Sequence, residues 1–85
     1  MLDRVPPSDR LLDIARGFAP ALPSSVAAAR DASLSEAGLT SMGAVRLMLA
    51  VEAAFDIALP EAELTPANFA TIRAIEAMLA RLRAA

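Results

Sequence analysis

The stretch AGLTSMGAVRLMLAVEAAFDIALP, residues 37–60, decides how the rest of this 85-residue chain is interpreted. Its central part, residues 42–55, is rich in Ala, Leu and Met, which favour helices, and contains no proline. Apolar residues recur on one side at helical spacing, and we expect that side to face the core. They are Ala44, Leu47, Met48, Val51 and Phe55. The stretch predicts a long helix that begins beside Ser41.

A second apolar stripe lies on another side of the same helix. Met42, Val45 and Leu49 form it, with Arg46 beside them. A helix that is apolar on more than one side is either buried centrally among other helices or offers the extra stripe to a partner or ligand. The sequence leaves both interpretations open.

The preceding part of the chain predicts one helix and a long connection. Pro6-Pro7 and then Ser8 form a break and a cap, so a helix is expected over residues 8–18, with Gly17 near its end. Residues 19–40 lack sustained periodicity and are expected to be a long loop. Within it, Ser33-Leu34-Ser35-Glu36 has the spacing of a capping box and predicts a single helical turn ending at Gly38. Leu34 and Leu39 should attach the loop to the core.

Two further helices are expected after Pro60. Thr65-Pro66 has the cap-and-proline pattern of a short helix over residues 66–70, with Phe69 as its anchor. Residues 71–83 predict a last helix whose apolar face comprises Ile72, Ile75, Met78, Leu79 and Leu82. No segment has strand periodicity. We therefore predict an all-α fold, a small four-helix bundle of three longer helices and one short one, in a single domain over residues 1–85 with the ordered bundle at about 8–83.

Composition excludes several classes of function. The formal net charge of −2 and the pI near 4.9 argue against binding to nucleic acid, which requires a basic patch. Without His or Cys, the chain lacks the usual catalytic bases and zinc ligands, and its aspartates have no metal-loop spacing. We expect neither a metal site nor a self-sufficient enzyme. The longest uncharged run, residues 17–29, is too short to cross a bilayer, and no secretory signal opens the chain. The expectation is a cytoplasmic monomer.

Ser41 is the candidate reactive residue. Thr40-Ser41 before a helix is most often a simple cap, whose oxygen accepts hydrogen bonds from free N–H groups. A helix N-terminus also favours an anionic group, and a phosphate ester on Ser41 would lie there. Gly38 and Gly43 keep the surroundings open.

At this point the residues resemble a known family, the acyl and peptidyl carrier proteins. The resemblance rests on Gly38-Leu39-Thr40-Ser41-Met42, then Phe55, then Leu59-Pro60, and on helix order over about residues 8–83. It implies that a phosphopantetheinyl transferase attaches 4′-phosphopantetheine from coenzyme A to Ser41. The working thiol would then belong to the prosthetic group, which accounts for a chain without cysteine.

Among carriers, the chain looks most like small stand-alone aminoacyl carrier proteins. That similarity covers residues 37–42, 45–49, 52–57 and 68–76. It implies loading with an amino acid by a synthetase-like amino acid:carrier-protein ligase, and delivery to a downstream acceptor enzyme. Two residues depart from the wider family: Thr40 stands where Asp is usual, and Arg46 where fatty-acid carriers tend to be acidic.

The resemblance also assigns a docking surface, formed by Thr40, Met42, Val45, Arg46 and Leu49. D-alanyl carriers are the nearest alternative, followed by polyketide, nonribosomal-peptide and fatty-acid carriers. A protein of another class also fits the sequence, namely a helical interaction module that presents the second stripe and carries no prosthetic group.

Overall fold

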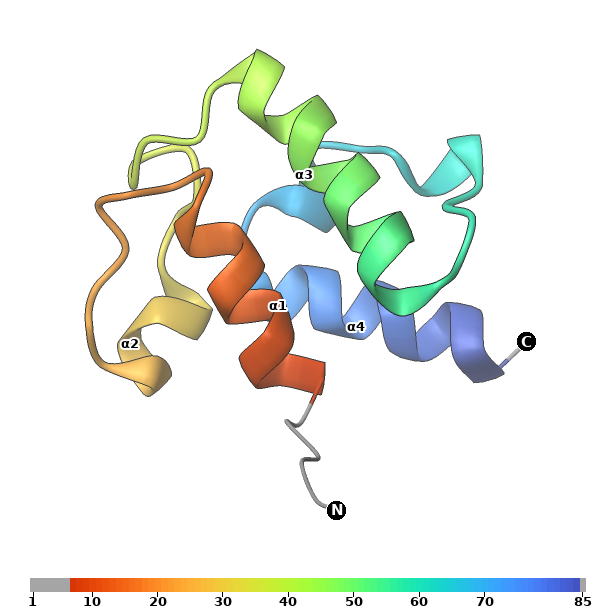
Figure 1. The fold of residues 1–85 in the computed structure, drawn as a ribbon, viewed down its shortest axis with the longest axis horizontal. Coiled ribbons are helices and arrows are strands. Elements are labelled where there is room, and N and C mark those ends of the chain that lie inside the picture. Colours follow the sequence, from red (N-terminus) through yellow and green to blue (C-terminus); the bar gives the residue numbers. More distant parts are fainter. Residues whose placement is uncertain (1–6, 85) are drawn as a thin grey trace.

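The computed structural model describes residues 7–84, and they form an all-helical bundle (Figure 1). The α-helices are α1 (Pro7–Arg16), α2 (Val26–Asp31), α3 (Ser41–Phe55) and α4 (Ile72–Ala84), and two 3₁₀ turns, η1 (Glu61–Glu63) and η2 (Ala67–Phe69), precede α4. The predicted four-helix, all-α fold is confirmed. The expected start of the domain and the expected break at Pro6 fall within residues 1–6, which lie outside the described residues.

Two elements differ from the sequence prediction. The connection expected over residues 19–40 contains a complete short helix, α2, which begins after Ser25 and is capped by that side chain. The short helix expected over residues 66–70 is only the 3₁₀ turn η2, since its N–H groups donate to carbonyls three residues earlier, as Phe69 does to Pro66. The short α-helix of the bundle is therefore α2.

The helical turn predicted by the capping box is confirmed. Ser33 Oγ accepts a hydrogen bond from the N–H of Glu36 at 3.2 Å, and the turn ends at Gly38, whose φ is 109°. A φ this large strains any residue with a Cβ but is readily adopted by glycine, which explains the residue at this position. Leu34 is fully buried and Leu39 packs against the core, as expected.

The core lies between α1, α3 and α4, with α2 closing one side against α4 (Figure 1). Its fully buried large side chains are Leu11, Leu34, Leu47, Val51, Ile72, Ile75 and Met78. The predicted core faces of α3 and α4 are both confirmed, because each contributes buried residues at the expected spacing. Each such side chain contributes about 1.5–3 kcal/mol on burial.

Ion pairs hold α2 in place. Arg30 at the end of α2 pairs with Glu76 of α4, and Asp31 pairs with Arg73. The hydrogen bond from Arg73 lowers the pKa of the Asp31 carboxyl below its ordinary value. Only Ala29 of α2 is buried in the core, and the two ion pairs add links from the end of the helix to α4.

Two groups of contacts orient α3. At its end, Asp56 adopts a left-handed conformation with φ 54°, and its N–H donates to the carbonyl of Glu52. The Glu52 carboxylate accepts from the N–H of Leu59 at 2.7 Å, which folds the Leu59-Pro60 step back toward the helix. From α1, Arg10 donates to the carbonyl of Ala54 at 2.7 Å and lies over the Phe55 ring. The helix axis is thereby fixed at the end remote from Ser41.

Among residues 7–84, every helix is too short or too polar to cross a membrane.

Candidate functional site

Ser41 is the first residue of α3, and its side chain is exposed. The capping role belongs to its neighbour: Thr40 has extended backbone angles, and its Oγ1 accepts from the N–H of Gly43 at 2.9 Å. Within residues 7–84 no hydrogen bond engages the Ser41 hydroxyl, whereas Ser25 and Ser33 both cap turns. The structure thus separates the cap from the candidate attachment residue, which the dipeptide alone could not do.

The electrostatics of this helix end favour an added anion. The first turn of α3 contains no acidic residue, so the partial positive charge of the helix N-terminus is not offset within the helix. Gly43 packs close to Thr40, since a Cβ there would lie 3.1 Å from Oγ1 of Thr40 and 3.3 Å from Cδ1 of Leu39. A larger residue would push the Thr40 and Leu39 side chains outward by a few tenths of an ångström, so glycine allows the cap to lie tight against the first turn.

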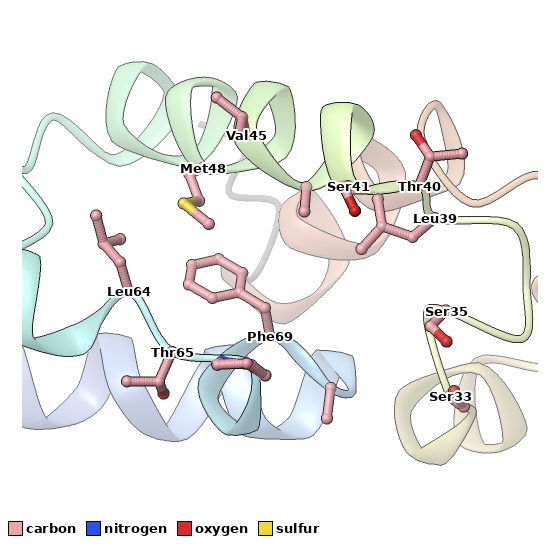
Figure 2. A pocket seen from close by; sticks show the side chains of 13 residues that line it. Ser33, Ser35, Leu39, Thr40, Ser41, Val45, Met48, Leu64, Thr65 and Phe69 are labelled. Atoms are coloured by element: carbon pink, nitrogen blue, oxygen red, sulfur yellow. The ribbon is translucent and has the colours of Figure 1, made fainter.

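A cavity of about 520 Å³ opens beside Ser41 (Figure 2). Ser41, Ala44, Val45 and Met48 of α3 form one wall, and the opposite wall is the segment over residues 64–70. In Figure 2 the Phe69 ring points from that segment toward α3, with Leu64 and Met48 at one end and Ser33 and Ser35 toward the other. Its volume falls within the range of about 300–1,000 Å³ of small-molecule sites.

The walls combine an apolar interior with hydroxyl groups. Leu39, Met48, Leu64 and Phe69 are among the apolar lining residues, while Ser33, Ser35, Thr40, Ser41 and Thr65 supply hydroxyls. Such walls fit a flexible chain that alternates methylene or methyl groups with amides. The residues present therefore fit a phosphopantetheine arm that starts from Ser41.

The second stripe of α3 is on the surface. Met42, Val45 and Leu49 are 66%, 52% and 60% exposed, and Arg46 is exposed beside them. The interpretation that the stripe is buried in the bundle is therefore wrong. All five residues expected to form the docking surface lie on α3 or at its cap, on a surface that begins beside Ser41 and extends to Leu49.

The sequence did not indicate the cavity. Its walls come from three separated segments, near residues 33–35, 39–48 and 64–70, and only their tertiary packing brings these together. The one sequence feature that could have pointed to the cavity is Leu64, an apolar residue placed between acidic Glu63 and the Thr65-Pro66 turn. In the structure Leu64 is 39% exposed and lines the cavity.

Comparison with known families agrees with this geometry. Residues 9–79 match the family described as "Phosphopantetheine attachment site". That description confirms the expected prosthetic group, 4′-phosphopantetheine, as the group characteristic of this family.

Curated relatives are aminoacyl carrier proteins. The chain is 51% identical over 49 residues to aminoacyl carrier protein 2 of Bradyrhizobium diazoefficiens, covering 58% of this chain and 55% of that protein. It is 50% identical over 48 residues to the aminoacyl carrier protein of Agrobacterium fabrum, covering 56% and 58%. The matches span little more than half the length of these relatives.

Solved structures match over more of their length. One chain belongs to the crystal structure of an engineered Bradyrhizobium japonicum glycine:[carrier protein] ligase complexed with carrier protein from Agrobacterium tumefaciens and ATP. It has a TM-score of 0.72 and 39% identity, with 87% of this chain and 96% of that one covered. Another belongs to the B. japonicum ligase complexed with glycylated carrier protein, with a TM-score of 0.67, 40% identity and coverages of 84% and 96%. The chain described here therefore belongs to the phosphopantetheine attachment family of carrier proteins.

Proposed function

We propose that this chain is a carrier protein that holds an amino acid on a 4′-phosphopantetheine arm attached to Ser41. The observation that carries the proposal is the exposed Ser41 hydroxyl, left free by the Thr40 cap, at the start of α3 and on the rim of a cavity. The family description and the aminoacyl carrier relatives support it.

The chain's own part in attachment is to present an oxygen. A phosphopantetheinyl transferase would remove the Ser41 proton, and Oγ would bond to the pantetheine-side phosphorus as the phosphoanhydride bond of coenzyme A breaks and adenosine 3′,5′-bisphosphate leaves. The N–H groups at the start of α3 would favour a phosphodiester on Ser41, since the first turn contains no carboxylate to oppose it. The attached group supplies a thiol at the end of a flexible arm, on which an amino acid can be held as a thioester.

The chain supplies no catalytic side chain in this proposal; it is a substrate of the transferase and of the activating ligase. Tethering the cargo raises its effective concentration at each enzyme that the carrier visits, including a downstream acceptor enzyme. The ligase complexes of the similar carrier proteins support an amino acid:carrier-protein ligase as the partner.

Intact mass spectrometry tests the attachment. Wild-type chain and Ser41→Ala would each be co-expressed with a broad-specificity phosphopantetheinyl transferase. Wild type should gain the mass of one phosphopantetheine and Ser41→Ala none. An unmodified wild type would instead favour the interaction module without a prosthetic group. Incubating the modified chain with candidate acids and their ligases then separates aminoacyl, D-alanyl and other acyl cargo.

Docking is tested by charge reversal. We propose that Thr40, Met42, Val45, Arg46 and Leu49 contact the ligase, because they form an exposed, largely apolar surface beside Ser41. Arg46→Glu should slow loading by the B. japonicum glycine:[carrier protein] ligase without altering helicity. Arg83→Glu makes the same change of net charge in the last turn of α4 and serves as the control. Equal loading of both variants at the parental rate would reject this surface.

A further inference from the structure

The cavity wall opposite α3 is attached to the bundle through few buried side chains. The segment over residues 60–70 includes this wall, and of its residues only Phe69 is buried. Leu59, just before the segment, is the buried residue at its other end. The stretch between these two apolar anchors includes Leu64, Thr65 and Pro66, which line the cavity.

A polar cluster centred on Glu63 holds the middle of this segment. The Glu63 carboxylate accepts from Arg81 Nη2 of α4 at 2.8 Å and from Asn68 Nδ2 at 2.9 Å. Asn68 Nδ2 also donates to the Glu63 carbonyl at 2.8 Å, and Asn68 Oδ1 accepts from Arg81 at 3.3 Å. The cluster joins η1, η2 and α4 through one carboxylate.

The backbone hydrogen bonds in the middle of the segment are local. The N–H groups of Glu63, Leu64 and Thr65 donate to residues two or three positions earlier. Such bonds fix the shape of the turns and leave their position relative to α4 undefined. Thr65 and Pro66 are bonded into η2, which packs on α4, because they accept from the N–H groups of Asn68 and Phe69. The side-chain ion pair from Glu63 to Arg81 links the preceding turn, η1, directly to α4.

The facing wall is more firmly fixed. Leu47 and Val51 anchor α3 in the core with no exposed surface, so the α3 side of the cavity follows the bundle. On the opposite side, Leu64 follows Glu63 directly, so the Glu63 cluster bears on where this part of the wall lies.

We propose that Glu63 is a positioning residue that, through Asn68 and Arg81, holds the wall of the cavity in which the arm of Ser41 lies. The inference rests on the proposed function, since it concerns the group carried by Ser41. Glu63 touches neither the arm nor its cargo. It acts by keeping Leu64 and Pro66 at a fixed distance from Met48.

The methionine methyl groups provide a test by NMR. Met48 lines the cavity, Met78 is fully buried in the core, and Met42 is exposed on the outer stripe. Spectra of 13C-methyl-methionine protein would be recorded before and after modification of Ser41. In the parental chain, the Met48 signal should move on modification while the Met78 signal does not.

Variants at Glu63 identify the role of the carboxylate. Glu63→Ala should shift or broaden the Met48 methyl signal in the unmodified chain. It should also reduce the movement of that signal on modification at least twofold, while the Met78 signal stays in place. Glu63→Gln keeps an acceptor for Asn68 and should restore at least half of that change. Asp31→Ala removes a different surface ion pair to α4, made by a residue that does not line the cavity, and should match the parental chain.

Each outcome decides a separate question. A parental Met48 signal that does not move on modification would overturn the inference, because the arm would not lie in the cavity. A Glu63→Ala spectrum equal to that of Asp31→Ala would also overturn it. Failure of Ser41 to be modified would reject the proposed function instead, and the unmodified Glu63→Ala spectrum would still report whether the wall moves.

Discussion

Thr40→Asp is expected to stabilise the unmodified protein at low ionic strength. Thr40 caps α3 through a 2.9 Å hydrogen bond from the N–H of Gly43, and an Asp carboxylate can accept the same bond. The first turn of α3 has no acidic residue, so the new charge meets an uncompensated helix N-terminus. A charge in this position contributes about 0.3–1 kcal/mol.

That free energy can be measured by thermal unfolding. For a domain of this size, 1 kcal/mol corresponds to roughly 4–8 °C in Tm, so Thr40→Asp should raise Tm by about 1–8 °C in a buffer of about 10 mM salt. The gain should vanish in about 1 M salt, where the Debye length is about 3 Å. Thr40→Asn is the matched control, because it keeps a capping oxygen without the charge. Thr40→Ala removes the cap and should cost about 1 kcal/mol.

Modification of Ser41 should reduce the benefit. A phosphodiester on Ser41 already places negative charge at the helix N-terminus, so a carboxylate introduced in place of Thr40 would be partly repelled. The Tm gain of Thr40→Asp should thus be smaller in the modified protein than in the unmodified one. The reasoning is refuted if Thr40→Asp and Thr40→Asn unfold at the same temperature in low salt, or if the gain persists in high salt.

Three further predictions concern the framework around the site. Leu47→Ala removes a fully buried side chain of α3 and should lower the free energy of unfolding in urea by about 2–5 kcal/mol. Leu49→Ala, on the exposed stripe, should change that free energy by less than about 0.5 kcal/mol, so equal losses would contradict the assigned faces of α3. Gly38→Ala should lower the same unfolding free energy by about 1–3 kcal/mol, because φ is 109° and the new Cβ would lie 3.2 Å from Cδ of Pro20. An unchanged unfolding free energy would show that this turn accommodates alanine without strain. Because Arg73 lowers the pKa of Asp31 in the folded chain, their pairing stabilises the protein above the carboxyl's ordinary pKa of 3.8, and this contribution is lost as the pH falls through the lowered value. The unfolding free energy, measured between about pH 2 and pH 6, should show this loss in the parental chain and not in Asp31→Asn. An identical pH profile in the variant would reject the assignment.

The sequence predicted the long helices well because their apolar spacing is regular. The range expected for the central helix, residues 42–55, differs from α3 by one residue at its start, and that expected for the last helix, residues 71–83, differs from α4 by one at each end. The first helix ends two residues earlier than residue 18, since Gly17 and Phe18 belong to a turn stabilised by bonds to Ile14 and Ala15. Local propensity and periodicity suffice where a helix is long enough to show both.

Helix α2 was missed for a physical reason. Six residues are too few for a stable helix in isolation, because nucleation costs more than so few hydrogen bonds return. In the folded chain it has the Ser25 cap, the core packing of Ala29, and ion pairs with Glu76 and Arg73, which lie more than 40 positions further along the chain. Contacts at that separation leave no trace in a short sequence window.

The sequence by itself determined the all-α class and the core faces of α3 and α4, because spacing along a helix follows directly from residue order. Its resemblance to carrier proteins indicated Ser41 as the candidate attachment residue. Only the tertiary structure decided that the stripe of Met42, Val45 and Leu49 is exposed, and that a cavity lies beside Ser41. Periodicity assigns residues to sides of a helix. Which side another segment covers depends on contacts between residues far apart in the chain, here between α3 and the wall held by Glu63.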